Sequence, residues 1–114
     1  LTFNPNPGIM ASMQLLTDEI KDSLPALYST EGTPLDKKQW IVKYFNPMGA
    51  GTWYICEGEQ REDGDWLFFG YCDLGFGCPE LGYVTLSELE SIQLPFGMSI
   101  ERDIFFDNPS TLSL

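Results

Sequence analysis

Acidic side chains are the residues of this sequence whose type and spacing could support chemistry. The densest group joins two apolar runs, is diluted only by Arg61, and contains five acids: Glu57, Glu59, Glu62, Asp63 and Asp65. Three interpretations are open: a solvated hairpin tip that discourages edge-to-edge aggregation, a recognition patch for a basic partner, and a calcium or magnesium site. The spacing does not match the alternating acids and closing glutamate of an EF-hand loop, so we expect no metal site. The group is our candidate partner-binding acidic cluster.

Two further pairs of acids are secondary candidates. Glu88 and Glu90 fall on a predicted helix, whereas Glu101 and Asp103 share one face of a predicted strand with Arg102 on the other face. Carboxylate pairs can do acid–base work in a pocket. Among 17 acids, however, finding a pair does not define a site, so we assign no catalytic residue. The ordinary expectation for Arg102 is an ion pair on the sheet surface.

Imitation of a nucleic acid is a further use for such a surface. Same-face carboxylates on a strand, such as Glu57 and Glu59, stand about 6.8 Å apart. A DNA duplex presents one charge per about 1.7 Å of its axis. One strand is therefore too sparse, and mimicry requires several acidic elements side by side. An inhibitory role of this kind depends on carboxylates gathered on one side of the molecule.

Several common chemistries are excluded by what the sequence lacks. Without histidine, Ser-His-Asp and Cys-His catalysis cannot operate in their usual forms, and zinc sites that mix cysteine with histidine cannot form. Three cysteines (Cys56, Cys72 and Cys78) cannot supply four thiolates and contain no C-x-x-C pair. The glycines at 75, 77 and 82 match no phosphate-binding pattern and predict turns. We therefore expect no cofactor.

Charge and hydropathy limit the kinds of binding partner and the cellular compartment that we expect for this protein. The 114 residues carry 17 acids and 6 bases, a formal net charge of -11, which opposes direct binding to nucleic acids or anionic membranes. No apolar run approaches the roughly 20 residues that a membrane span needs, and the start lacks a signal-peptide pattern. We expect a reduced, cytoplasmic protein without structural disulfides. A protein partner would then need a basic surface.

The chain is predicted to form one α+β domain over residues 13–106. Residues 1–12 contain Asn-Pro-Asn-Pro-Gly turn chemistry and are interpreted as an upstream extension or a remnant of cloning, and 107–114 as a loose or partly docked tail. Thr17 is a predicted helix N-cap, and one apolar helical face follows it. Pro25 predicts a kink or break at Leu24. Residues 29–38 are predicted as a loop.

Strand patterns occupy the middle of the chain. Three runs (39–45, 52–57 and 65–72) are joined by short connections that favour antiparallel hairpins. Tyr83 and Val84 suggest a fourth strand, Thr85 to Glu88 is a capping box that starts a helix, and 100–106 is a last strand. The fold class is therefore α+β, with an antiparallel sheet of four to five strands and two short helices. Run 65–72 lacks a polar face, which predicts a central strand or a contact surface.

Stretches along the whole chain from Met13 resemble one family, domain of unknown function 2958. They are MQLLT (13–17), LPALYS (24–29), VKYFNP (42–47), TWY (52–54), DGDWLFFGY (63–71), ELGY (80–83), SELE (87–90) and IERD (100–103). The resemblance implies a short bacterial protein, often encoded on plasmids, phages and integrative elements near accessory and defence-related genes. It carries over no catalytic residues.

Three functional hypotheses follow. The first is a non-enzymatic interaction module, an acidic inhibitor or nucleic-acid mimic that acts on a host protein with a basic surface. The alternative is a small-ligand-binding domain or a carboxylate-based enzyme with a pocket beside the sheet. The third is self-association as a homodimer through the apolar run, with Trp66, Phe68 and Phe69 at the contact.

Overall fold

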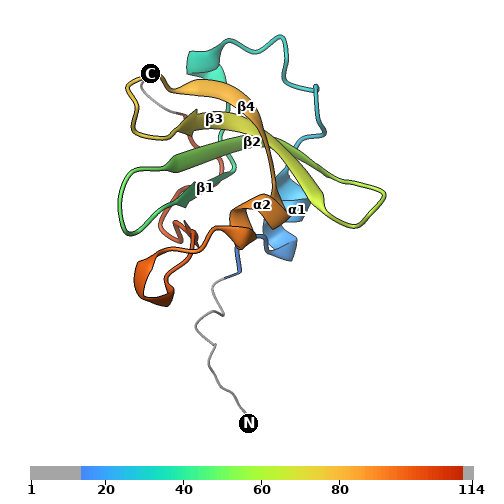
Figure 1. Cartoon of the computed structure of the whole chain (residues 1–114). Coiled ribbons are helices and arrows are strands. Elements are labelled where there is room, and N and C mark those ends of the chain that lie inside the picture. The colour runs from blue at the N-terminus through green and yellow to red at the C-terminus, as the bar shows by residue number, and fades with distance from the viewer. Residues whose placement is uncertain (1–13, 112–114) are drawn as a thin grey trace.

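The computed structural model of this chain describes residues 14–111 (Figure 1). It confirms the α+β class: five antiparallel strands form one sheet in the order β4-β3-β2-β1-β5. The strands are β1 (Val42–Phe45), β2 (Thr52–Gln60), β3 (Trp66–Asp73), β4 (Glu80–Thr85) and β5 (Glu101–Arg102). The segment 1–12, interpreted as an extension, lies outside the described residues, as do the last three residues of the predicted tail.

Two short helices pack on one face of the sheet, and their caps form as the sequence predicts. In α1 (Asp18–Ser23) the Thr17 hydroxyl accepts a hydrogen bond from the Ile20 amide at 3.2 Å. The helix ends where Pro25 excludes the helical conformation from Leu24, which is extended. In α2 (Leu86–Ser91) both bonds of the Thr85–Glu88 capping box are present. Local sequence thus sets where each helix begins.

The core lies between this face and the helices. Tyr44, Ile55 and Phe68 from the sheet and Leu89 from α2 are completely buried. The Tyr44 hydroxyl donates a 2.6 Å hydrogen bond to the Leu15 carbonyl oxygen, which ties the segment before α1 to β1. Ile20 of α1 belongs to the same buried cluster, so both helices pack against the central strands.

Residues 24–38, which we call the strap, pack against the second half of β2, after the part of β2 that pairs with β1. The Gly58 amide donates to the Pro25 carbonyl oxygen at 3.0 Å, and the Tyr28 ring reaches Tyr83 on β4 with ring centroids 6.4 Å apart. The 3-10 helix η2 (Leu35–Lys37) ends the strap before β1. Figure 1 shows this connection running over the side of the sheet away from α1 and α2.

Two predictions near the C-terminus need correction. The last strand covers only Glu101 and Arg102, because the Asp103 side chain accepts the Phe105 amide at 2.9 Å and turns the chain. Arg102 is not in a surface ion pair within the described residues; its Nε donates to the Gln14 carbonyl oxygen at 2.7 Å. The second 3-10 helix, η3 (Pro95–Gly97), precedes this strand.

Part of the predicted tail is docked on the domain, because Ser110 pairs with Trp40 in an isolated β-bridge.

Strand β3 is interior, as one interpretation of the apolar run predicted, because it lies between β2 and β4. Only one of its faces is closed: Phe68 is completely buried, whereas Phe69 and Tyr71 on the other face are half-buried. The strap and Trp40 cover that second face in part, since the Trp40 ring lies 6.2 Å from that of Tyr71. The apolar run is thus explained mostly by internal packing.

Candidate functional site

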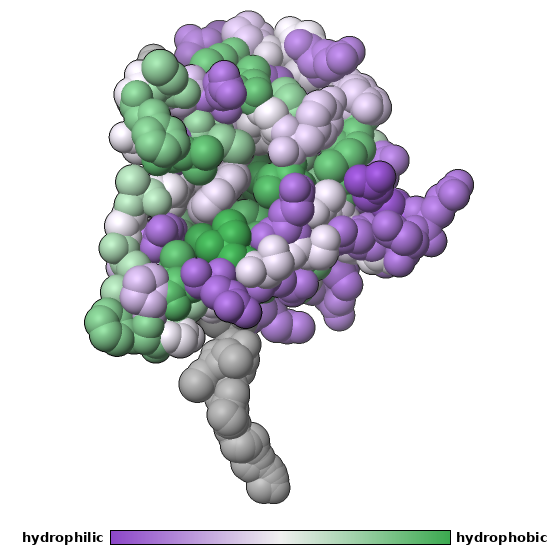
Figure 2. Space-filling model, viewed as in Figure 1, coloured by the Kyte–Doolittle hydropathy of each residue, from purple (hydrophilic) through white to green (hydrophobic). Residues whose placement is uncertain are grey.

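Three elements bring acidic side chains to one end of the molecule: α1, α2 and the hairpin that joins β2 to β3. We call this region the acidic end and define it by nine acids: Asp18, Glu19, Asp22, Glu59, Glu62, Asp63, Asp65, Glu88 and Glu90. With Lys21 and Arg61 it carries a formal charge of -7 out of the total of -11. Figure 2 shows hydrophilic side chains over the hairpin and below it. In these three elements acids outnumber bases nine to two.

The tip of this hairpin is a tight turn. The Arg61 amide donates to the Asp65 carbonyl oxygen at 2.7 Å, and Gly64 adopts a φ of 91°, which favours glycine. The Asp63 carboxylate accepts the Asp65 amide at 2.9 Å. Glu62 and Asp63 are exposed at this tip, and Glu59 is exposed at the end of β2. These three predicted residues are available to a partner.

Asp65 connects the hairpin to α2. Its Oδ1 accepts hydrogen bonds from the amides of Trp66 at 2.8 Å and Ser87 at 3.1 Å, and its Oδ2 accepts the Ser87 hydroxyl at 2.6 Å. The hydrogen bond from the Ser87 side chain is the largest of the effects that lower the pKa of Asp65. The carboxylate therefore holds the hairpin against the start of α2, where Glu88 and Glu90 follow.

Glu57 does not lie with the other predicted cluster residues on the surface. It is only 2% exposed, and its carboxylate accepts hydrogen bonds from the amide of Tyr28 at 2.7 Å, from the amide of Thr30 at 2.9 Å, and from the Thr30 hydroxyl. The partners are 29 and 27 residues away in the sequence. Glu57 thus organises the strap and offers no surface to a partner.

A β-bulge explains why Glu57 faces the strap. The register shifts between Ile55, which pairs with Gly70, and Glu57, which pairs with Phe69. Regular alternation would pair Glu57 with Phe68, whose side chain is buried in the core. The extra residue, Cys56, moves the carboxylate to the opposite face. Strand β2 runs on to Gln60, beyond the predicted end.

Lys38 is the other buried charge in this region and was not predicted. It is 5% exposed, and its Nζ donates to the Thr30 carbonyl oxygen at 2.7 Å and to the Thr30 hydroxyl oxygen at 3.3 Å. The Thr30 hydroxyl therefore accepts from Lys38 and donates to Glu57. Residues 29–38 carry no periodic apolar pattern, so sequence alone gave no sign of this network.

The two secondary pairs of acids lie in different parts of the molecule. Glu88 and Glu90 belong to the acidic end, although Glu88 Oε1 is also used by the capping box. Glu101 and Asp103 lie at the β5 edge of the sheet, and Asp103 pairs with Lys43 at 3.6 Å. A cavity of about 270 Å³ is lined by Glu19 and Asp103 together with Arg102, so two acids and one base share a concave surface there.

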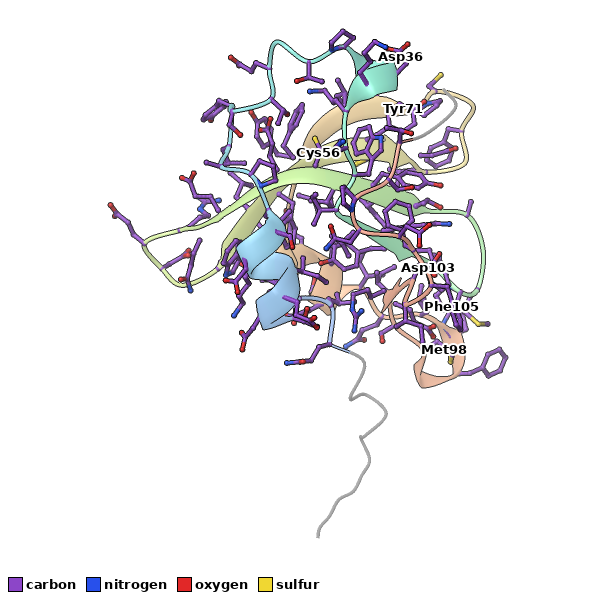
Figure 3. All side chains as sticks on the ribbon, turned by 180° about the vertical axis from the view of Figure 1, so that it is seen from behind. Asp36, Cys56, Tyr71, Met98, Asp103 and Phe105 are labelled. Carbon is purple, nitrogen blue, oxygen red and sulfur yellow. The ribbon has the colours of Figure 1, made fainter. Side chains whose placement is uncertain are left out.

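The aromatic residues predicted at a homodimer contact are largely used within the chain. Phe68 is completely buried, the Trp66 ring stacks on it at 6.5 Å, and Phe69 packs on Tyr83 at 5.0 Å. The most exposed aromatic rings lie in loops instead: Phe76, Phe96 and Phe105. Figure 3 places Phe105 near Met98 at the lower rim, at the opposite end from Asp36 of η2.

The cysteines are free thiols. Burial raises the pKa of Cys56 to about 11 and also raises the pKa of Cys72, so neither is a ready nucleophile at neutral pH. Within the described residues, no three side chains of the His, Cys, Asp or Glu types come together in a way that could hold a metal ion. No helix among residues 14–111 has both the length and the apolar composition of a membrane span.

Comparison with known families matches residues 15–114 to the family described as "Protein of unknown function (DUF2958)". Neither the curated proteins nor the solved structures give a significant match to this chain.

Proposed function

Because the chain belongs to the DUF2958 family, whose description assigns no activity, we propose a function from its charge distribution: a non-enzymatic protein–protein interaction module. Its acidic end binds the basic surface of a protein partner. The observation that carries the proposal is the excess of acids over bases, nine to two, on α1, α2 and the β2–β3 hairpin. Concentrated charge of one sign steers a complementary partner and fixes its orientation.

Nucleic-acid mimicry is the finer form of this proposal. One strand presents carboxylates too sparsely to resemble a duplex, but here a hairpin and two helices contribute acids to the same end. A protein that normally binds nucleic acid fits such a surface, and the acidic end then inhibits it by occupying its binding site. We place this accessory role in the cytoplasm of a bacterium that carries a mobile element.

Affinity capture with matched charge variants tests the proposal. The first variant combines Glu59→Gln, Glu62→Gln and Glu90→Gln at the acidic end. The control combines Glu31→Gln, Asp36→Asn and Asp107→Asn, which removes the same charge from exposed positions elsewhere. Quantitative mass spectrometry at low and high salt should find a partner that wild type and control retain, and that the first variant and high salt release. Equal capture by both variants contradicts the proposal.

Duplex DNA of random sequence, added to the captured complex, separates the two forms of the proposal. If the partner uses its nucleic-acid site for the acidic end, the duplex releases it in proportion to its concentration. A partner that is lost from the acidic-end variant but unaffected by DNA supports the interaction module and rejects mimicry.

A further inference from the structure

A cavity of about 600 Å³ lies between the strap, the start of β1 and the segment that contains Asn108 and Pro109. None of the nine acids of the acidic end lines it, although Ser23 at the end of α1 does. Its size falls within the roughly 300–1,000 Å³ range of small-molecule sites. The polar groups around it include Thr30, Lys37 and Lys38. None of its described lining residues is acidic. In a chain of 17 acids and 6 bases, a cavity with two lysines and no carboxylate is a local inversion of charge.

Lys38 is the buried charged residue in the lining of this cavity. It is 5% exposed, and two of its three N–H donors are used by the carbonyl and hydroxyl oxygens of Thr30. The ion pairs among the described residues are Lys21 with Asp18 and Lys43 with Asp103, so Lys38 has no carboxylate at ion-pairing distance. Its balancing charge, on Glu57, acts through the Thr30 hydroxyl.

This arrangement favours a negatively charged ligand. Buried charges are normally paired and hydrogen-bonded directly, because an unpaired charge is costly to desolvate. An oxyanion in the cavity would accept the remaining N–H of Lys38 and supply the missing direct partner. Lys37, which is exposed, adds a second positive charge, and the Thr33 side chain adds a polar group to the lining.

We propose that this cavity binds a small molecule through an oxyanion, either a phosphate or a carboxylate group, placed against the Nζ of Lys38. Ile41, Pro25 and Pro109 provide apolar surface for the remainder of the ligand. The proposal does not rest on the proposed function, because none of the nine acids of the acidic end lines this cavity. The charge of a lysine can bind either a phosphate or a carboxylate group, and the experiment below distinguishes the two.

Titration of the isotopically labelled full-length protein with inorganic phosphate, and separately with acetate, tests the site by NMR. Sodium chloride at matched ionic strength is the reference. We expect saturable amide shifts confined to residues 23–26, 30–41 and 108–110, which contain the lining of the cavity. The anion that saturates at lower concentration identifies the preferred group. The proposal is overturned if neither anion gives saturable shifts, or if the shifts follow Lys21 and Arg61.

Two variants assign the effect to the cavity. Lys38→Met should weaken binding roughly tenfold or more, because it removes a charged hydrogen bond. Lys37→Gln should weaken it a few-fold, and Lys21→Gln, on α1, is the control and should leave it unchanged. If Lys38→Met does not fold, the exposed Lys37→Gln variant and the pattern of wild-type shifts still decide the result. Unchanged binding in both cavity variants contradicts the proposal.

Discussion

Glu57 and Lys38, two buried side chains of opposite charge, are joined through the single hydroxyl group of Thr30. Neither charge reaches the other directly, and the carboxylate is further held by the amides of Tyr28 and Thr30. One β2 residue thus fixes the path of the strap and helps to balance the charge of the lysine that lines the large cavity. The network gives the strap a structural basis that can be tested by single substitutions.

Replacing Glu57 with glutamine should destabilise the protein by about 2–4 kcal/mol, because Lys38 loses its balancing charge while it stays buried. Urea unfolding followed by tryptophan fluorescence measures the change. Glu59→Gln, two residues further along β2 and exposed, is the matched control and should stay within about 0.5 kcal/mol of wild type. Equal free energies of unfolding for the two variants would show that the buried network contributes nothing.

Thr30→Val keeps the shape of the side chain and removes its hydroxyl group. We expect a loss of about 1–3 kcal/mol in the free energy of unfolding, since a donor to Glu57 and an acceptor for Lys38 both disappear. Thr30→Ser retains the hydroxyl and should recover most of that loss. A valine variant as stable as the serine variant would contradict the assigned role of the hydroxyl.

The contact between Asp65 and Ser87 should make stability depend on pH in the acidic range. The pKa of Asp65 is lower in the folded protein than in the unfolded chain, so its contribution is present above the ordinary aspartate pKa and is lost as pH falls through the folded value. Asp65→Asn should therefore be less stable than wild type at neutral pH, and the difference should shrink below about pH 4. A difference that does not change with pH would argue against the contact.

Gly70 and Gly82 face each other across β3 and β4, and replacement by alanine should destabilise the protein at Gly70 but not at Gly82. A Cβ at Gly70 would lie 2.0 Å from the Tyr54 carbonyl oxygen, a backbone atom that cannot move without disturbing β2. At Gly82 a Cβ meets nothing within 4 Å. We expect Gly70→Ala to lose more than about 3 kcal/mol or fail to fold, and Gly82→Ala to remain near wild type. Thermal unfolding of the pair provides the comparison.

Thiol alkylation should distinguish the three cysteines. Cys78 is exposed, whereas Cys56 is buried and has a pKa of about 11. Peptide mapping after brief treatment with iodoacetamide at neutral pH should find Cys78 labelled first and Cys56 labelled only after unfolding. Comparable labelling of both in the native protein would mean that the β-bulge at Cys56 opens readily.

Sequence patterns predicted the features that depend on neighbouring residues. The Thr17 cap, the break at Pro25 and the Thr85–Glu88 capping box are each decided within one helical turn, and all three form. The order of the first strands followed from short connections. The end of β5 was missed because the turn at Asp103 competes with the alternating pattern that continues past it.

The sequence predicted the surface position of a site residue only where that residue makes no contact with residues far away in the chain. Glu59, Glu62 and Asp63 lie on the surface of the hairpin as expected. Glu57 and Asp65 look the same in sequence, yet one is buried by a bulge and by partners in the strap, and the other is bound to Ser87, 22 residues away. Nothing in the local sequence encodes these partners.

The attachment of the hairpin to α2 through Asp65 and Ser87 also bears on how a complex would form. A free loop must give up conformational entropy when it docks, which reduces the net affinity. Here the chain has already been ordered during folding, so little of that cost remains for the encounter. Long-range electrostatic attraction between the partner and the acidic end then needs no reordering of the hairpin. We expect a fast association rate that falls steeply as salt is added.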